Sequence, residues 1–345
     1  MSTAVSILVE ETSKTAEARR TAREMALHMG MDEAGAEHVA IVATEACTNL
    51  LKHAGGGQVL LQTSTEDSNG LPVLEMLAVD QGPGMSNLEA CLRDGYSTGS
   101  SPGQGLGAIQ RMSKQSDIYT LPGKGTVVLA RWFLCTSGWK PAIHLGAVNV
   151  AKNGEEVCGD SWGAVWSDRE LVIIVADGLG HGLEARLASV EAVRQLQQNP
   201  ELAPKPLLTR IHQALRSTRG AAVAIARIDT ARGKLTYAGV GNISARIYLG
   251  TSESRLGTSE SRQNLVSMNG TAGHQCERIQ EFSYPWPDHG LLLLHSDGLA
   301  TGTTLDAYPG LAARDPALIA GVLYRDFSRG RDDATVVVAK ANGIG

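Results

Sequence analysis

The sequence predicts two domains, an α/β domain followed by an α+β sandwich domain. The chain has 345 residues, which is enough for two domains of roughly 150 residues each. Helical and strand patterns alternate up to Phe133, whereas from His144 paired strand patterns are followed by two helical patterns and then by further strands. We therefore expect domains at residues 1–135 and 144–345, joined by a linker at residues 136–143.

The first domain begins with an apolar strand pattern at residues 4–10 and a helical pattern at residues 13–29. A second helix is expected from Asp32, its N-cap, to the glycines that start at Gly55 and end it. Its apolar residues recur at helical spacing, at Val39, Val42, Ala43, Ala46 and Leu50. The remaining patterns predict strands at 58–64 and 71–80, helices at 86–95 and 106–115, and a strand hairpin at 116–121 and 125–134.

The second domain is expected to place two helices between two groups of strands. The helical patterns lie at residues 182–198 and 206–218. The strand patterns lie at 144–152, 161–166, 170–177, 221–229, 234–241, 244–250, 290–298 and 333–340. One internal repeat, "GTSESRL" followed by "GTSESRQ" at residues 250–263, offers no core residue except Leu256, so we interpret it as a duplicated flexible loop.

Composition and charge narrow the class of protein. The net charge of -5 and the pI of about 6.0 argue against a nucleic-acid-binding surface. The five cysteines form no CxxC pair, which indicates reduced thiols and a cytoplasmic protein. The N-terminus lacks the basic region of a signal peptide, and no apolar run approaches the roughly 20 residues of a membrane span, so we expect no membrane association.

Three features of the first domain indicate a phosphate-binding site. Glu45 and Asn49 are four residues apart and share one face of the second helix. Asp80 ends a strand before a Gly-Pro-Gly corner, and "GQGLG" at residues 103–107 opens a helix behind a loop rich in serine and glycine. Glycines before a helix let backbone N–H groups approach phosphate oxygens. An exposed Glu alone would most often be only solvated, but the features in this order favour a binding site.

This order of motifs resembles the GHKL ATPase superfamily, and closely the RsbT-type serine kinases of bacterial partner-switching systems. The motifs are "EACTN", "DQGPGM" and "GQGLG", and the resemblance covers roughly residues 1 to 134. It implies a Bergerat-type α/β sandwich that binds ATP and Mg²⁺. By resemblance, Glu45 would be the general base on a substrate hydroxyl, Asn49 would hold Mg²⁺ and Asp80 would bind the adenine amino group. The loop glycines Gly82 and Gly84 would lie near the base, and Gly103, Gly105, Leu106 and Gly107 would wrap the triphosphate.

The second domain carries carboxylates at several strand ends. They are Asp160, Asp177, Asp297 and the pair Asp332–Asp333. Each Asp alone could cap a turn, since Asp-Gly is a common turn sequence. Several carboxylates at strand ends, with no basic side chains to pair with them, are better explained by a shared divalent metal ion. Carboxylates are suitable ligands for Mg²⁺ and Mn²⁺.

This set resembles the metal-dependent protein phosphatases of the PPM type, specifically the SpoIIE-type branch, over roughly residues 144 to 341. The segment "YAGVGNI" is similar to the small RsbX-type members. The resemblance implies an α-β-β-α sandwich with two Mn²⁺ or Mg²⁺ ions. Asp177 would bridge both ions and be catalytic, with the Gly178 carbonyl on one of them. Asp297 and Asp332 would complete the second ion, Asp160 would contact metal-bound water, and Asp333 would have a lesser role.

Two parts of this phosphatase reading stay open. His181 lies in the metal loop, where a role in the turn is at least as well supported as catalysis. The sequence identifies no general acid and no arginine that would clamp the phosphate.

The sequence supports a bifunctional partner-switching regulator as its first function. It would be a Ser/Thr kinase for a STAS-domain protein and a phosphoserine/phosphothreonine phosphatase for the same or a related protein. Both reactions on one substrate would only hydrolyse ATP, so separate substrates or a controlling signal are expected. The alternative is that the first domain binds ATP only to hold a partner, such as a sigma factor or a downstream phosphatase. A third interpretation is that both sites have lost catalysis and serve only as sensors. It is less well supported for the phosphatase, where all the acidic positions are present.

Overall fold

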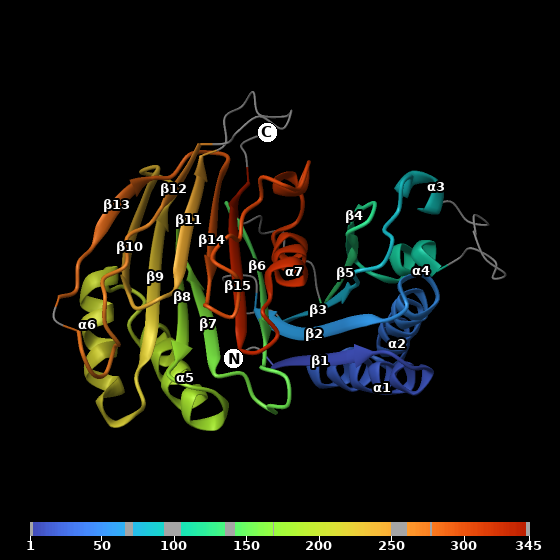
Figure 1. The fold of residues 1–345 in the computed structure, drawn as a ribbon, viewed down its shortest axis with the longest axis horizontal. Helices are drawn as coiled ribbons and strands as arrows, with labels where there is room; N and C mark the ends of the chain where they lie inside the picture. Colours follow the sequence, from blue (N-terminus) through green and yellow to red (C-terminus); the bar gives the residue numbers. More distant parts are fainter. Residues whose placement is uncertain are drawn as a thin grey trace. The chain divides into compact units, whose positions relative to one another are not determined.

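The computed structural model describes residues 3–65, 72–92, 105–134, 142–167, 169–249, 261–276 and 278–342. The chain divides into two compact units, Met1–Trp139 and Lys140–Gly345 (Figure 1). This division falls within the segment 136–143 that the sequence predicts as a linker. The first strand of the second unit begins at Ile143, one residue before the expected start of that domain.

The first unit is a five-stranded antiparallel sheet with helices on one face. The strands lie in the order β1-β2-β3-β5-β4, and alternate residues along them share one buried core with residues of α1, α2 and α4. The strands are β1 (Thr3–Val9), β2 (Gly57–Thr65), β3 (Pro72–Val79), β4 (Gln115–Leu121) and β5 (Gly125–Phe133). The helices are α1 (Thr12–Met29), α2 (Glu33–Asn49), α3 (Leu88–Leu92) and α4 (Gly105–Met112). This is the expected α/β sandwich.

Helix α2 begins where the sequence predicts and ends in an unusual way. The Asp32 carboxylate accepts a hydrogen bond from the Gly35 backbone N–H at 2.8 Å, which satisfies one free donor of the first turn. After Asn49 the helix widens into a π-helical turn over Leu50–Ala54. Gly55, at φ 74°, then ends it in the left-handed conformation that favours glycine. π-helical turns are frequent at functional sites, and this one follows the expected metal-binding asparagine directly.

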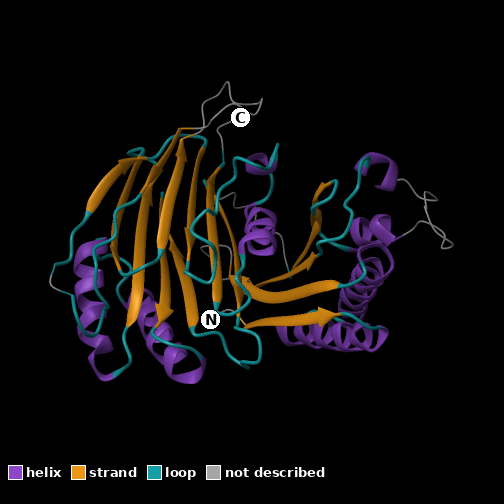
Figure 2. Cartoon of the chain, viewed as in Figure 1, coloured by secondary structure: helices purple, strands orange, loops and turns teal. Residues whose placement is uncertain are grey.

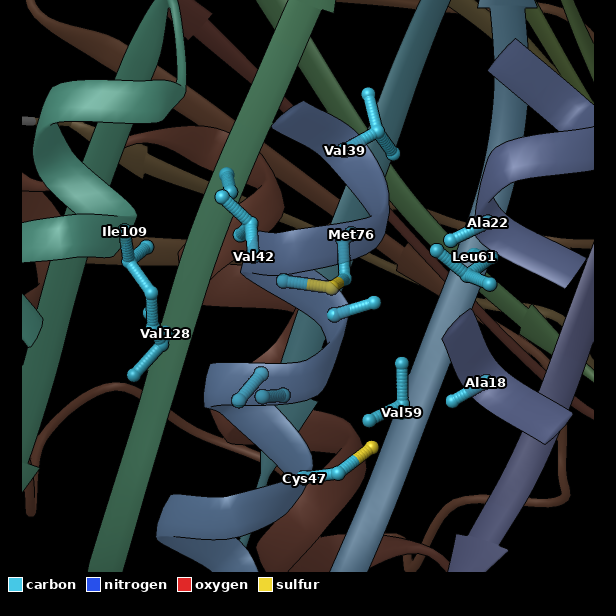
Figure 3. Close-up of a cluster of buried hydrophobic side chains, with 14 of the residues drawn as sticks. Ala18, Ala22, Val39, Val42, Cys47, Val59, Leu61, Met76, Ile109 and Val128 are labelled. Atoms are coloured by element: carbon cyan, nitrogen blue, oxygen red, sulfur yellow. The ribbon is translucent and has the colours of Figure 1, made fainter. Parts of the chain in front are cut away.

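The core of the first unit forms between α2 and the sheet. Figure 3 shows Val39 and Val42 of α2 beside Met76 of β3 and Val59 of β2, and all four side chains are fully buried. Ala18 of α1 lies in the same cluster, where its small side chain lets that helix pack closely. The apolar stripe that predicted the helix is therefore the face that packs on the sheet. Burial of these side chains stabilises the fold by roughly 1.5–3 kcal/mol for each large residue.

The second unit is a four-layer sandwich of two sheets between helices (Figure 2). One sheet has the order β13-β10-β9-β8-β7 and the other β12-β11-β14-β15-β6. The first is covered by α5 (Gly182–Gln198) and α6 (Pro204–Ala214), and α7 (Pro316–Phe327) packs on β6 and β15 of the second. The strands are β6 (Ile143–Val150), β7 (Asp160–Trp166), β8 (Glu170–Gly178), β9 (Ala221–Asp229), β10 (Lys234–Val240), β11 (Ser244–Leu249), β12 (Ser261–Asn264), β13 (Phe282–Pro285), β14 (Gly290–His295) and β15 (Ala334–Ala341). This confirms the expected α-β-β-α architecture.

Helix α7 and the strands β12 and β13 are elements that the sequence patterns did not reveal. Almost all of α7 is buried, so it has no polar face and no amphipathic period to detect. Its local signals were present, since the Asp315 carboxylate accepts from the Ala317 N–H and Pro316 occupies the first turn. The helix expected at 206–218 ends earlier, at Ala214, and continues as a 3₁₀ turn over Leu215–Ser217.

The interpretation of the repeat as a flexible loop is wrong for its last three residues. Residues 261–263 belong to β12, which pairs with β11 from Leu249↔Ser261 to Arg246↔Asn264. The rest of the repeat, residues 250–260, lies outside the described residues. Backbone pairing along the edge of a sheet recruits polar residues that carry no strand signal of their own. Among the described helices, none combines the length and apolar character that a membrane span needs.

Candidate functional site

Helices α2 and α4 bring three of the expected kinase residues together. Glu45 and Asn49 lie half-buried on one face of α2, and Gly105, the first residue of α4, lies directly against them. A Cβ atom at Gly105 would be 3.0 Å from Asn49 Oδ1 and 3.2 Å from Glu45 Oε2. The side-chain nitrogen of Asn49 is buried and has no hydrogen-bond partner within the described residues. A buried polar atom without a partner is costly, so a ligand at this point would relieve that cost.

The carboxylate of Asp80 is held by the backbone on both sides of it. Its Oδ1 accepts hydrogen bonds from the N–H groups of Gly82, at 2.8 Å, and Thr126, at 3.1 Å. The Asp80 N–H in turn donates to the Thr126 carbonyl at 3.0 Å. These bonds tie the end of β3 to the start of β5, so the carboxylate keeps one orientation at the end of these two central strands.

The glycines of the Gly-Pro-Gly corner have packing reasons of their own. A Cβ at Gly82 would be 2.7 Å from the Cα of Ala54, in the π-helical turn that follows α2. Gly84 has φ 67°, and a Cβ there would lie 2.1 Å from the Leu121 carbonyl oxygen. The corner therefore packs tightly against the end of α2 and against β4. As a result, α2 and the π-helical turn after it contact both glycine segments: Ala54 of the turn contacts the Gly-Pro-Gly corner, and Asn49 and Glu45 of α2 contact Gly105.

The other expected nucleotide-binding residues are only partly described. Leu106 is half-buried and packs on the core, and Gly107 is buried within α4. Gly103 lies outside the described residues.

Four carboxylates converge at the ends of strands in the second unit. Asp160 and Asp177 are direct neighbours across the antiparallel pair β7–β8. Asp297 follows β14 and Asp332 precedes β15, and these two strands also pair. The charges of Asp160, Asp297 and Asp332 all act on Asp177 and raise its pKa. The structure thus brings together acids that are up to 172 residues apart in sequence, from Asp160 to Asp332.

Burial and mutual repulsion raise the pKa values of these acids. Burial is the largest cause for Asp177, whose pKa rises to about 9, and the neighbouring carboxylates add to it. Burial also raises the pKa of Asp160 to about 7, although hydrogen bonds from the hydroxyls of Ser296 and Thr335 oppose the rise. For Asp297, burial and the charge of Asp332 raise the pKa. A bound cation would favour the ionised forms of these three carboxyl groups, so the site favours cations.

The residues fit a divalent metal ion. One carboxylate oxygen of Asp160 is buried without a hydrogen-bond partner in the described part of the chain. Within the described ranges, no three His, Cys, Asp or Glu side chains are close enough to form a preformed metal cluster. The donor type fits nevertheless, because carboxylate oxygens are the ligands that Mg²⁺ and Mn²⁺ prefer.

The side chain of Asp333, to which the sequence gives a lesser role at the metal site, holds a loop in the structure. Its side chain is 3% exposed, and its two oxygens accept hydrogen bonds from the N–H groups of Lys152, at 2.8 Å, and Gly159, at 2.9 Å. Asp333 therefore fastens both ends of the loop at 152–159, directly before Asp160. The charge of Asp332 raises the pKa values of Asp177 and Asp297, whereas the structure shows that Asp333 holds a loop.

Gly178 ends β8, and His181 lies in the loop between β8 and α5. Gly178 has no room for a side chain, because a Cβ there would be 2.0 Å from the Ala185 carbonyl oxygen of α5. His181 is the residue before α5, and its exposed ring nitrogen Nδ1 lies 2.6 Å from Glu155 Oε1. This contact links the loop to the neighbouring segment, which supports a structural role for His181 in the turn.

Sequence reasoning missed the residues that hold the carboxylates in place. Asn242 Nδ2 donates a hydrogen bond to Asp297 Oδ2 at 2.7 Å, and the Ser296 and Thr335 hydroxyls contact Asp160. Asn242 lies in "YAGVGNI", which is similar to a segment of the RsbX-type proteins. That similarity predicted no role for the Asn242 side chain. No spacing rule links an Asn to an Asp that comes 55 residues later.

We expect the metal-free chain to lose stability as the pH rises, because of Asp177. Its pKa is near 3.8 when unfolded and about 9 when folded. Between these values the folded state binds the extra proton, so the favourable contribution is complete below about pH 4 and is lost as the pH rises to about 9. Thermal unfolding in a chelator should show Asp177→Asn becoming more stable than the wild type by a margin that grows with pH. A margin that stays constant across this range would contradict the raised pKa.

We expect Asn242→Ala to weaken metal binding without unfolding the protein. Without its partner, Asp297 loses the hydrogen bond that orients it, and outer-shell changes of this kind typically cost about tenfold or more in metal affinity. Isothermal titration with Mn²⁺ measures the effect. Asn264→Ala, an exposed asparagine on β12, is the matched control and should bind Mn²⁺ like the wild type. Equal affinities for all three proteins would show that Asn242 does not position Asp297.

Two protein families match the chain, one in each unit. Residues 167–342, about half of the chain, match the family described as Stage II sporulation protein E (SpoIIE). Residues 8–132 match the histidine kinase-like ATPase domain. Both matches agree with the motifs that carried the resemblance in the sequence.

Two relatives from Bacillus subtilis (strain 168) match separate parts of the chain. Phosphoserine phosphatase RsbX is 28% identical over 149 residues, which cover 43% of this chain and 70% of RsbX. Serine/threonine-protein kinase RsbT is 28% identical over 116 residues, which cover 33% of this chain and 86% of RsbT. One chain here thus combines regions similar to two separate proteins.

Two solved structures share the fold over more than half of the chain. The crystal structure of RsbX in complex with magnesium has a TM-score of 0.51 at 22% identity and covers 58% of this chain and 96% of that one. The second structure is described as "The bacterial stressosome: a modular system that has been adapted to control secondary messenger signaling". Its TM-score is 0.51 at 26% identity, and the match covers 57% of this chain and 98% of that chain.

Proposed function

The chain belongs to the stage II sporulation protein E family, and on that premise we propose that it is a bifunctional partner-switching regulator. Its second unit would remove phosphate from phosphoserine or phosphothreonine in a STAS-domain protein. Its first unit would phosphorylate the same or a related protein with ATP. Both activities would operate in the cytoplasm. The single observation that carries the proposal is the convergence of Asp160, Asp177, Asp297 and Asp332 from four strand ends.

For the phosphatase, we assign the metal ligands from this convergence. Asp177, the Gly178 carbonyl, Asp297 and Asp332 would hold two divalent ions, with the Gly178 carbonyl on one of them, and Asp160 would contact metal-bound water. Divalent ions bound there would lower the pKa of a water molecule and neutralise charge on the phosphate. The chain's own contribution is to keep the carboxylates oriented: Asn242 fixes Asp297 at 2.7 Å, and the Ser296 and Thr335 hydroxyls favour the ionised form of Asp160.

For the kinase, the support is the packing of α4 on α2. Glu45 would accept the proton of the substrate hydroxyl, and Asn49 would hold Mg²⁺ against the phosphates of ATP. Gly105 lies directly over both side chains, so phosphates bound at the start of α4 would be beside them. Asp80, fixed by the N–H groups of Gly82 and Thr126, would bind the adenine amino group.

A single incubation tests the proposal as a whole. The full chain is mixed with a STAS-domain protein, ATP and Mg²⁺ or Mn²⁺, and the intact mass of the partner is followed. Gain of one phosphate supports the kinase, and metal-dependent loss of phosphate from a phosphorylated partner supports the phosphatase. If neither mass change occurs with any STAS partner, the proposed substrate class is wrong.

The alternative, an ATP-dependent binding module in the first unit, uses the same residues. Asn49, Asp80 and the glycines would bind nucleotide in either case, and only Glu45 is specific to catalysis. A comparison of partner binding with ADP and with ATP separates the two, because a module that only holds its partner has no need of the γ-phosphate for chemistry.

A further inference from the structure

Three leucines form an exposed row on helix α5 and on the loop before it. Leu179, Leu183 and Leu187 follow one another at intervals of four residues, and each of them is more than half exposed. The opposite face of α5 is buried against the sheet through small residues such as Ala188 and Ala192. This leucine row therefore lies on the side of α5 that faces away from the core of the second unit.

The leucine row is a continuous apolar surface, unlike the other exposed apolar residues. In the described part of the chain, the other large apolar residues that are exposed are Leu8, Leu134 and Val266, each in a different segment. Single exposed apolar residues are common and need no explanation, whereas a contiguous apolar patch marks an interaction site. Leu183 and Leu187 are about 6 Å apart along the helix axis, so their side chains adjoin on one face.

The backbone holds the start of the leucine row beside the acidic cluster. Leu179 follows Asp177 by two residues, and its N–H donates to the Gly220 carbonyl at 3.0 Å. Gly180 and Gly182 then have φ values of 94° and 73°, in the left-handed region that favours glycine. These glycines turn the chain from β8 into α5, so the row leads from the acidic cluster onto the helix.

Several charged side chains of α5 are already engaged within the second unit. Glu191 forms an ion pair with Arg194 at 2.6 Å. Arg186 Nη1 donates a hydrogen bond to the Cys158 carbonyl at 3.4 Å. A partner that covers the leucine row would therefore gain mainly from the burial of apolar surface.

The position of the leucine row indicates the phosphoprotein substrate as its partner. A phosphoserine on a protein reaches the carboxylates only if the protein surface around it approaches Asp177. Leu179 lies two residues from Asp177, so such a substrate would cover it, and α5 continues the same surface through Leu183 and Leu187. A small phosphate ester has no protein surface with which to cover the row.

We propose that Leu179, Leu183 and Leu187 bind an apolar patch of the phosphoprotein substrate, next to its phosphorylated residue. The inference rests on the proposed phosphatase function and states how that site selects its substrate. The carboxylates hold the ions in this assignment, and the leucine row gives folded phosphoproteins an advantage over small phosphate esters. Contacts of this kind are made equally in the ground state and the transition state, so they set KM and leave kcat unchanged.

Steady-state kinetics with two substrates test the assignment. The Mn²⁺-loaded full chain is given a phosphorylated STAS partner or p-nitrophenyl phosphate. Leu183→Ser/Leu187→Ser should raise KM for the phosphoprotein about tenfold at unchanged kcat, because apolar contact is lost from the complex. Hydrolysis of the ester should match the wild type. Leu179 is left unchanged because it adjoins the acidic cluster.

Two further variants and a binding measurement separate docking from a structural effect. Leu183→Met/Leu187→Met keeps an apolar surface and should keep the wild-type KM. Val266→Ser, an exposed apolar residue outside the row, is the matched control and should change neither substrate. In the Asp177→Asn background, where turnover is not expected, the two serine substitutions should weaken binding of the phosphoprotein about tenfold in isothermal titration.

The outcomes distinguish failure of this inference from failure of the proposed function. An unchanged KM for the phosphoprotein in the serine variant overturns the inference while the phosphatase stands. An equal loss with both substrates also overturns it, because the defect then lies at the acidic cluster. So does light scattering in which the serine variant separates a wild-type dimer without a change in KM, since the row would then bind a second copy of the chain.

The wild type alone tests the premise. If it hydrolyses the ester but no phosphoprotein, the catalytic site stands and the docking surface is wrong. If it hydrolyses neither substrate, the proposed phosphatase function is wrong and the inference falls with it.

Discussion

Asp177→Asn is expected to abolish metal-dependent removal of phosphate, with kcat/KM falling by at least about a thousandfold, which corresponds to several kcal/mol of transition-state stabilisation. Asp177 is the carboxylate on which the charges of Asp160, Asp297 and Asp332 all act. Asparagine keeps the shape of the side chain but cannot supply a bridging negative charge. The measurement is release of phosphate from a phosphorylated STAS partner with Mn²⁺ at saturating concentration.

The control for this variant is an aspartate outside the cluster. Asp288 is exposed, in the turn before β14, and Asp288→Asn should keep wild-type activity. Metal-dependent activity that persists in Asp177→Asn would refute the assignment of the metal site. Because Asp177→Asn removes a carboxylate with a raised pKa, we expect the variant to remain folded, and thermal unfolding of the variant checks that loss of activity is not caused by unfolding.

Glu45→Gln is expected to lower phosphoryl transfer to the partner by about 10²–10⁴-fold while nucleotide binding is retained. Gln has the shape of Glu and can still pack under Gly105, but it cannot accept the hydroxyl proton. Transfer is measured with radiolabelled ATP and a STAS partner, and nucleotide affinity by titration with ADP. The two readouts separate chemistry from binding.

Glu24→Gln provides the comparison for Glu45→Gln. Glu24 is exposed on α1, so its loss should change neither readout. Transfer that is equal in Glu45→Gln and in the wild type would show that Glu45 is not the general base. If the wild type transfers no label to any partner but binds it in the presence of nucleotide, the first unit is a binding module instead of a kinase.

The elements that the sequence predicted are those whose signals are local. Asp32 caps α2 as expected, because the cap and the N–H that it satisfies are three residues apart. The apolar stripe of α2 predicted its buried face, since helical spacing and burial have the same period. Helix α7 was missed for the converse reason: it is buried almost all round, and a uniform apolar segment has no period.

In the candidate sites too, the residues with local sequence signals were predicted and those with long-range contacts were not. Motif order indicated Glu45, Asn49, Asp80 and the acidic positions, because each lies at an end or on a face that its own segment defines. The resemblance gave Asp333 a lesser role than Asp332, but the motif order gave no way to say what that role is. Both oxygens of Asp333 are engaged by backbone N–H groups of a loop more than 170 residues away, which is a long-range contact and leaves no trace in the local pattern.

By itself, therefore, the sequence determined the two-domain order, the α/β and sandwich architectures and the identity of the acids, because these depend on periodicity, turn chemistry and residue type over short stretches. Only the tertiary structure decided which groups meet. The pairing of β7 with β8 and of β14 with β15 brings the acids together, and the pairing of β11 with β14 brings Asn242 to Asp297. Such contacts join residues far apart in the chain, and their energies depend on distance in space, which sequence spacing does not encode.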